Sequence, residues 1–457
     1  MEKKVDGIYD GFKELGTGKM VVLGIQHVFA MFGATVLVPL LTGLSVSVTL
    51  CAAGIATIWF FFITKRKVPV FLGSSFAFLG AFEVVAPLLP DATGALTVAN
   101  TEMLPYATGG VVCAGLVYVV LAALFQIFGA KKIMKLFPPV VTGPIIILIG
   151  LILSSSAIDN AQNNWILAII TIAIVISVNL FGKGMIKIVP ILISLFATYI
   201  IGCIVTAIAP NLFGLPWVSF EKLTDLFKDG VQFKDFIAIP PFMLPKFEIS
   251  AIVAFVVVAI AAIVEHIGDV CAIGATCGKN FIADPGLTRT LLGDGIGTSL
   301  AGLIGGPANT TYSENTGVVA MTKVYDPKVM FIAAIFAILL SLLNIFDAFI
   351  NTIPAAIIGG MSIVLYGMIS ATGVRTIMEN KVDYTKMRNI LISALILVCG
   401  IGFNSSPIVI PVGDTAISFG GLASAAIIGI VVNAILPGKD YEFNEEAIEA
   451  DERSIEN

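Results

Sequence analysis

Long apolar runs separated by short polar loops constrain this chain more than any other feature. A helix needs about 20 mostly apolar residues to cross a bilayer. We expect fourteen such spans, numbered 1 to 14 in chain order: 20–41, 45–64, 69–89, 107–129, 136–155, 164–181, 188–209, 249–272, 289–305, 306–322, 328–347, 352–372, 388–406 and 414–436. The sequence therefore predicts an all-α polytopic protein of the cell membrane.

The composition excludes most other classes of protein. Hydrophobic residues make up 57% of the 457 residues and charged residues only 12%, about half the share of a soluble domain. A net charge of −5 gives no basic surface for nucleic acid. We find no zinc-protease, hydrolase or Asp-rich motif and no cysteine pattern typical of a zinc site. We therefore expect no enzyme, no catalytic residue, no metal and no cofactor.

The loop charges predict the orientation. With fourteen spans, 22 of the 26 Lys and Arg residues fall on one side, which the positive-inside rule makes cytoplasmic. Residues 1–19 and the acidic tail 437–457 then lie in the cytoplasm, and the long loop 210–247 lies outside.

Two spans seven apart resemble each other. Span 5 reads PPVVTGPIIILIGLILS from Pro138, span 12 reads PAAIIGGMSIVLYGMIS from Pro354, and Pro, Gly and Ser recur at one offset. An odd number of spans in each unit inverts the second copy. This predicts two inverted repeats of seven spans, as in secondary transporters with a site at the midplane.

Spans 3 and 10 hold the corresponding interruptions. Residues 73–75 (GSS) break the apolar run of span 3, and span 10 is preceded and opened by the polar stretch GGPANTTYSENTG at 305–317. Non-helical backbone at this depth must be buried in protein or line a cavity. Each break leaves free backbone N–H groups at the start of a half-helix, which can hold a ligand oxygen.

Acidic residues inside the spans are the candidate functional groups. Glu265 and Asp269 are four apart and share one helix face, whereas the adjacent His266 points elsewhere. Two carboxylates on an apolar face resist double ionisation and can share a proton near neutral pH. Glu314 lies in the break of span 10, and Asp294 in span 9 either braces the site or serves as a further acid.

These groups favour a small, planar, uncharged substrate. Spans 3, 8 and 10 contain carboxylates and backbone donors but no Lys or Arg that would neutralise an anion. A pyrimidine-type ring fits, with imide N–H groups on carboxylates, carbonyls on N–H donors and its face on Phe76. Sodium and sulfate fit less well.

Four motifs carry a resemblance to a known family. They are QHVFAMFGATVLVP in span 1, LGSSFAF in span 3, EHIGD in span 8 and NTTYSENTGVVAMTK into span 10. In these motifs, and over most of residues 20–436, the chain resembles the nucleobase–ascorbate transporter family. The motif Glu314–Gly317, followed by Thr322 and Lys323, matches the family signature.

The resemblance implies an architecture and a mechanism. A core domain (20–129 and 249–347) would slide like an elevator against a gate domain (136–209 and 352–436), which also forms a homodimer surface. Short strands in spans 3 and 10 would pair across the core.

The resemblance also implies a site. Glu265 and Glu314 would bind the imide edge of the base, and the backbone at Ser313 and Phe76 would hold its carbonyls. The residues closing the pocket would be Ala34, Tyr312 and Tyr366. From the acidic residues themselves, we expect Glu265, Asp269 and Asp294 to couple transport to protons, the only coupling ion expected.

Three positions bear on the substrate. Glu314 stands where purine-type members carry glutamine, which favours uracil. Asp269 replaces the histidine of uracil-type relatives, so the proton relay differs. Asp294 matches purine-type members, so a xanthine or urate permease remains an alternative. An anion transporter on the same scaffold is a further alternative, disfavoured by the missing site cation.

Overall fold

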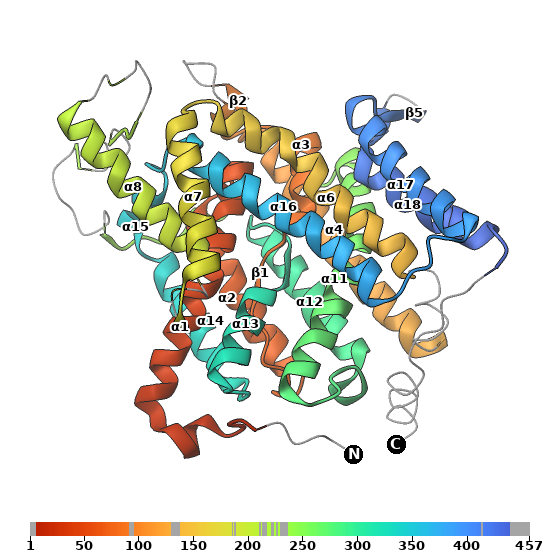
Figure 1. Ribbon diagram of the computed structural model, residues 1–457, viewed down its shortest axis with the longest axis horizontal. Coiled ribbons are helices and arrows are strands. Elements are labelled where there is room, and N and C mark those ends of the chain that lie inside the picture. The colour runs from red at the N-terminus through yellow and green to blue at the C-terminus, as the bar shows by residue number, and fades with distance from the viewer. Residues whose placement is uncertain are drawn as a thin grey trace.

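A computed structural model describes residues 6–90, 96–128, 138–184, 186, 189–209, 212, 217–220, 224, 227–228, 236–412 and 415–438. Helices dominate the fold (Figure 1). Residues 439–457, which include nearly all of the predicted acidic tail, and most of the 210–247 loop lie outside the described residues.

The helices of the first half are α1 (Gly11–Thr42), α2 (Val46–Ile63), η1 (Phe76–Phe78), α3 (Leu79–Val85), α4 (Leu104–Phe128), α6 (Pro139–Ala161), α7 (Trp165–Phe181) and α8 (Pro190–Ile208). Those of the second half are α11 (Ile249–Cys277), η4 (Ile282–Gly286), α12 (Leu287–Leu303), α13 (Ser313–Thr322), α14 (Lys328–Ser341), α15 (Asn344–Ile350), α16 (Ala355–Glu379), α17 (Met387–Ser405) and α18 (Gly421–Ile435).

The strands form three two-stranded antiparallel sheets: β1 (Leu72–Ser74) with β4 (Asn309–Thr311), β2 (Leu89–Pro90) with β3 (Leu96–Val98), and β5 (Ile408–Val412) with β6 (Thr415–Phe419).

Many of the helices suit a bilayer. Among the described residues, eight are long and apolar enough to cross a membrane: α1, α2, α4, α6, α8, α11, α16 and α17. Four shorter apolar helices are Phe76–Val85, α7, α14 and α18. The polar α12 and α13 occupy predicted spans 9 and 10. The protein is therefore a mostly helical, multi-pass membrane protein.

Two predicted spans are interrupted in the structure. Predicted span 11 (328–347) divides into α14 and α15, because the Leu342 carbonyl accepts a 3.0 Å hydrogen bond from Ala238 N–H and Leu343 forms a bridge with Ile237. Predicted span 14 (414–436) begins as strand β6, and its helix starts only at Gly421. The short runs IVIPV and TAISF on the two sides of the Gly413-Asp414 dipeptide are rich in β-branched and aromatic residues, which is a hairpin signal. A count of apolar residues does not distinguish such a hairpin from a helix.

The two halves of the chain make matching contacts. Helix α2 packs on α14 as α12 packs on α4, and α1 packs on α14 as α11 packs on α4. Likewise α7 contacts α8 as α17 contacts α18, and α6 and α16 pack on each other. In Figure 1, α16 runs beside α6, with α7 and α8 to one side and α17 and α18 to the other.

Small residues allow α6 and α16 to approach closely. A Cβ on Gly150 would lie 2.2 Å from the carbonyl oxygen of Tyr366 and 2.3 Å from the hydroxyl of Ser370. The Ser370 hydroxyl donates a 3.0 Å hydrogen bond to the Ile147 carbonyl of α6. The spacing of Pro, Gly and Ser that predicted spans 5 and 12 share thus lies in a helix–helix contact.

The N-terminal segment contacts two elements of the second half of the chain. The N-terminal segment pairs with the loop before α14, because Ile8 N–H donates 2.8 Å to the Lys323 carbonyl. The Tyr9 hydroxyl donates 2.7 Å to the carbonyl of Cys277 at the end of α11. These bonds bring the N-terminal segment, the end of α11 and the loop before α14 together.

Candidate functional site

Strands β1 and β4 cross at the centre of the site. Their register pairs Leu72 with Thr311, Gly73 with Thr310 and Ser74 with Asn309. One more backbone bond flanks each end, from Ser75 N–H to the Ala308 carbonyl (2.8 Å) and from Tyr312 N–H to the Phe71 carbonyl (3.1 Å). A half-helix begins directly after each strand, at Phe76 and at Ser313.

No side chain caps either of these two half-helices. The first backbone N–H groups of a helix have no partner within the helix. The two breaks therefore bring two sets of backbone donors to the ends of one short ribbon, where a ligand oxygen can accept from them.

The phenol of Tyr312 locks this crossing in place. Its hydroxyl donates 2.8 Å to the Ser74 carbonyl and lies 3.3 Å from the Thr35 hydroxyl of α1. Gly73 is required because a Cβ there would lie 2.5 Å from the Tyr312 ring. The ring of Tyr312 therefore borders the site, while its hydroxyl is occupied by hydrogen bonds to Ser74 and Thr35. The contact with Thr35 was not predicted from the sequence.

Three acidic side chains lie beside the crossing and are partly buried: Glu265 and Asp269 of α11 and Glu314 in the first turn of α13. Glu265 is close enough to Glu314 for their charges to repel each other, and Asp269 is close enough to both. The Thr311 hydroxyl donates 2.7 Å to Oδ2 of Asp269. The structure thus brings together the predicted acids of spans 8 and 10.

Asp294 lies behind these acids and pairs with the histidine that points away from them. His266 Nδ1 is 2.8 Å from Asp294 Oδ2, and both side chains are fully buried. Tyr118 of α4 is close enough to feel the charges of Asp294 and Glu265. Asp294 therefore joins α12 to α11, which is the bracing geometry considered from the sequence.

A second contact fastens the half-helix of span 10 to span 1. Asn315 Nδ2 donates 3.1 Å to the His27 carbonyl and lies 3.1 Å from His27 Nδ1. Both residues are fully buried. This bond anchors α13 at Asn315, the residue that follows Glu314.

The remaining predicted residues divide into two groups. Phe76 is partly buried and Ser313 is exposed, and both begin half-helices at the crossing. Ala34 is buried on α1 beside Thr35. Tyr366, by contrast, is buried where α16 packs on α6, and the acid whose charge acts on it is Glu83 of α3.

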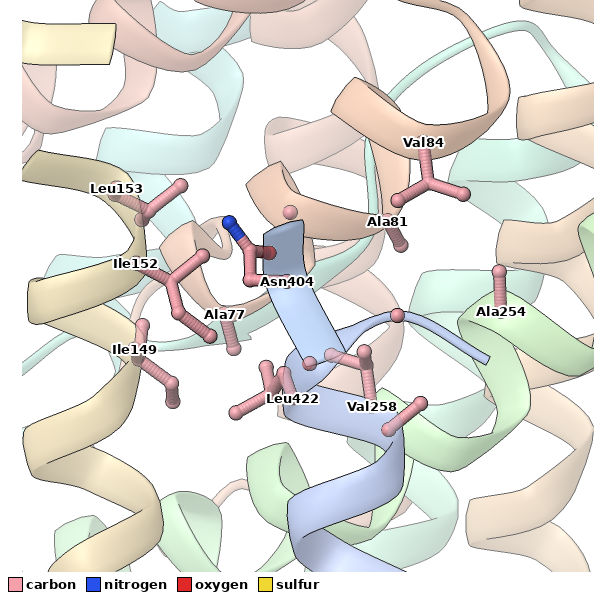
Figure 2. Close-up of a pocket in the computed structure, with 14 residues that line it drawn as sticks. Ala77, Ala81, Val84, Ile149, Ile152, Leu153, Ala254, Val258, Asn404 and Leu422 are labelled. Carbon is pink, nitrogen blue, oxygen red and sulfur yellow. The ribbon is translucent and has the colours of Figure 1, made fainter. Parts of the chain in front are cut away.

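An apolar hollow adjoins the crossing, with a volume of about 460 Å³ that includes space open to the outside. Figure 2 shows side chains that line it from η1, α3, α6, α11, α17 and α18: Ala77, Ala81, Val84, Ile149, Ile152, Leu153, Ala254, Val258, Asn404 and Leu422. Ala77 follows Phe76 directly, and Val258 precedes Glu265 by about two helical turns. The hollow therefore lies between α11, which carries Glu265 and Asp269, and the helices α6, α17 and α18.

The charge at the crossing is one-sided. Predicted spans 3, 8 and 10 contain no Lys or Arg. Among the described residues, no group of three or more His, Cys, Asp or Glu side chains could hold a metal ion. The site combines carboxylate acceptors with backbone N–H donors and suits a neutral ligand that has both donors and acceptors.

Comparisons with known proteins identify the family. A model for xanthine and uracil permeases, described as a permease family, matches residues 18–409. The chain belongs to this nucleobase–ascorbate transporter family. Membership confirms the resemblance carried by the four sequence motifs, and it makes the protein a nucleobase transporter and not an enzyme.

Two relatives within the nucleobase–ascorbate transporter family match nearly end to end. The uracil permease of Bacillus caldolyticus is 37% identical and that of Bacillus subtilis (strain 168) is 36% identical. The matches cover 92% and 91% of this chain and 93% and 92% of the two relatives.

Solved structures share the fold of this family member at low sequence identity. The transmembrane domain of the cyanobacterial bicarbonate transporter BicA has a TM-score of 0.57 at 15% identity, covering 94% of this chain and all of that chain. Murine Slc26a9 has a TM-score of 0.64 at 9% identity, covering 91% of this chain and 67% of that chain.

Proposed function

We propose that this protein takes up uracil across the cell membrane together with protons. The observation that carries the proposal is the juxtaposition of Glu265 of α11 with Glu314 in the first turn of the α13 half-helix, in predicted spans that contain no side-chain cation. The names of the two Bacillus relatives, both uracil permeases, support the same substrate.

Uracil matches this set of groups. Its ring N–H groups would donate to the carboxylates of Glu265 and Glu314, and its two carbonyls would accept from the backbone N–H groups at Phe76 and Ser313. The face of the ring would stack on Phe76. Hydrogen bonds to charged groups are stronger than neutral ones, so the two acids would contribute most of the specificity.

Proton coupling would arise from crowding of the acids. Glu265, Asp269 and Glu314 repel one another when ionised, and a proton shared among them relieves the repulsion. Linkage requires that protonation and uracil binding then favour each other. Asp294 would act through this cluster while it stays paired with His266.

We further propose how the chain is organised. The fourteen spans would form two inverted repeats with both termini in the cytoplasm, a core made of α1–α4 and α11–α15, and a gate made of α6–α8 and α16–α18. The core would slide against the gate along the hollow, and two copies would associate through their gates. The matching contacts of the two chain halves support this arrangement.

Uptake into proteoliposomes tests the proposal. An imposed gradient, acidic outside and without sodium, should drive accumulation of labelled uracil, and collapse of the gradient should abolish it. Accumulation that persists after collapse rejects proton coupling. Failure of uracil both to be taken up and to stabilise the purified protein against heat rejects uracil as the substrate.

A purine permease is the second candidate, favoured by Asp294. Competition against labelled uracil by unlabelled xanthine and urate distinguishes the two. Stronger competition by a purine than by unlabelled uracil would assign the site to purines.

A further inference from the structure

One threonine hydroxyl holds each of the two crossing strands from outside. Thr57 of α2 accepts a 2.9 Å hydrogen bond from the N–H of Leu72 and donates 3.2 Å to the carbonyl of the same residue. Thr298 of α12 accepts 3.3 Å from the N–H of Asn309 and donates 3.0 Å to its carbonyl. Both threonines are fully buried.

The two contacts occupy equivalent places in the two chain halves. Thr57 is the twelfth residue of α2, and Thr298 is the twelfth residue of α12. Each hydroxyl holds the first residue of its strand, and a half-helix begins four residues later in both cases, at Phe76 and at Ser313. The same local device is therefore present twice.

The hydroxyls replace missing neighbouring strands. Antiparallel partners alternate between bonding to each other and pointing outward. Backbone bonds join Tyr312 to Phe71 and Ser75 to Ala308 at the two ends of the ribbon. The N–H and carbonyl groups of Leu72 and Asn309 therefore point away from the other strand. Unpaired buried backbone groups are costly, and an isolated two-stranded ribbon is marginal by itself.

We propose that Thr57 and Thr298 are positioning residues for substrate recognition. This inference rests on the proposed function, because the backbone donors that follow the two strands are those assigned to the uracil carbonyls. Each hydroxyl fixes the depth and rotation of its strand and thereby places one set of donors. Loss of one hydroxyl moves one set and weakens its hydrogen bond to one carbonyl.

Substitution by valine removes the hydroxyl at nearly constant volume. In T57V and in T298V the KM for uracil should rise about tenfold, the equivalent of one net hydrogen bond. Thiouracils carry a weaker acceptor in place of one carbonyl. The preference for uracil over 2-thiouracil should fall in one variant, and the preference over 4-thiouracil should fall in the other.

The same helices provide matched controls. Thr49 of α2 and Thr290 of α12 are also fully buried, but their hydroxyls donate to the Ser45 and Leu287 carbonyls of their own segments. T49V and T290V should keep the KM and the preferences of the wild type. T57S and T298S retain the hydroxyl and should also resemble the wild type.

The outcomes separate the inference from the proposed function. Unchanged KM and unchanged thiouracil preferences in both T57V and T298V overturn it, and so does a loss of heat stability with both quantities unchanged. Where a valine variant does not fold, the comparison of T57C with T57S and of T298C with T298S replaces it, because a thiol is a weak donor. If the wild type does not bind uracil, the proposed function fails, and xanthine, which also carries two carbonyls, serves for the same comparison of variants.

Discussion

The hydroxyl of Thr311 donates a 2.7 Å hydrogen bond to the carboxylate of Asp269. It ties strand β4, which leads into the Glu314 half-helix, to the helix that carries Glu265. The bond therefore links Glu265 and Glu314, the two acids proposed to bind the substrate, through Asp269, which does not need to contact the substrate.

This coupling can be tested at Asp269. Asp269→Asn keeps an oxygen that accepts from Thr311 but cannot exchange a proton. We expect uracil binding to persist while the stimulation of uptake by an acidic exterior falls severalfold. Binding is measured by heat stabilisation and coupling by the ratio of uptake with and without the gradient. Thr311→Val, which keeps the acid and breaks the bond, should mainly raise the KM. Full gradient stimulation in Asp269→Asn would remove Asp269 from the coupling cluster.

Glu314→Gln should weaken uracil transport and admit purines. The change replaces a charged acceptor by a neutral amide, and a hydrogen bond to a charged group contributes about 1.5–3 kcal/mol, so we expect roughly a tenfold to hundredfold rise in KM. Competition by unlabelled xanthine measures the change in selectivity. Glu379→Gln is the control, because that exposed carboxylate pairs with Arg375 at the end of α16. Wild-type uracil kinetics in Glu314→Gln would place Glu314 outside the site.

Filling the hollow should stop transport without unfolding the protein. A Cβ on Gly80, which lines the hollow, would meet no atom within 4 Å. Gly80→Leu should therefore fold and gain up to about 1 kcal/mol of helix stability, yet obstruct the sliding of α3 past α6. Gly402→Leu also enters open space, on α17, and is not among the lining residues. We expect it to transport normally. Normal uptake by Gly80→Leu would show that the hollow is not part of the sliding surface.

The buried pair of His266 and Asp294 should contribute stability only as a pair. Removal of one partner leaves a fully buried polar group alone, which typically costs about 3–5 kcal/mol. His266→Leu and Asp294→Leu should each lower the melting temperature markedly, and the double variant should recover much of the loss. Melting curves of the purified protein measure all three. Additive losses in the double variant would contradict the pairing.

The sequence predicted most helices because their apolar runs match the thickness of a bilayer. It also located the two breaks, since GSS at 73–75 and the polar stretch at 305–317 interrupt runs that otherwise suit a membrane. Predicted spans 11 and 14 differ from the structure for a different reason. A long-range backbone contact with Ile237 and Ala238 ends α14, and an apolar hairpin has the hydropathy of a helix.

The site was only partly predictable. The four-residue spacing of Glu265 and Asp269 on one helix predicted their common face, and Glu314 followed from its place in the break. The contacts of Thr35, Thr57 and Thr298 were not predictable, because a buried threonine looks the same in the sequence whether its hydroxyl bonds its own helix or a distant strand. The place of Tyr366 against α6 depends likewise on helix packing.

The crossing of β1 and β4 also bears on how tightly such a carrier insulates the membrane. It gathers the positive ends of two half-helices and several carboxylates into one small volume. The carboxylates would repel a chloride ion, and the positive helix ends would repel a potassium ion. Each inorganic ion therefore meets an unfavourable electrostatic interaction there. A solute that is neutral as a whole and polar at its edges satisfies both sets of groups. The site therefore favours such a solute over inorganic ions, and this preference limits the leak of ions across the membrane.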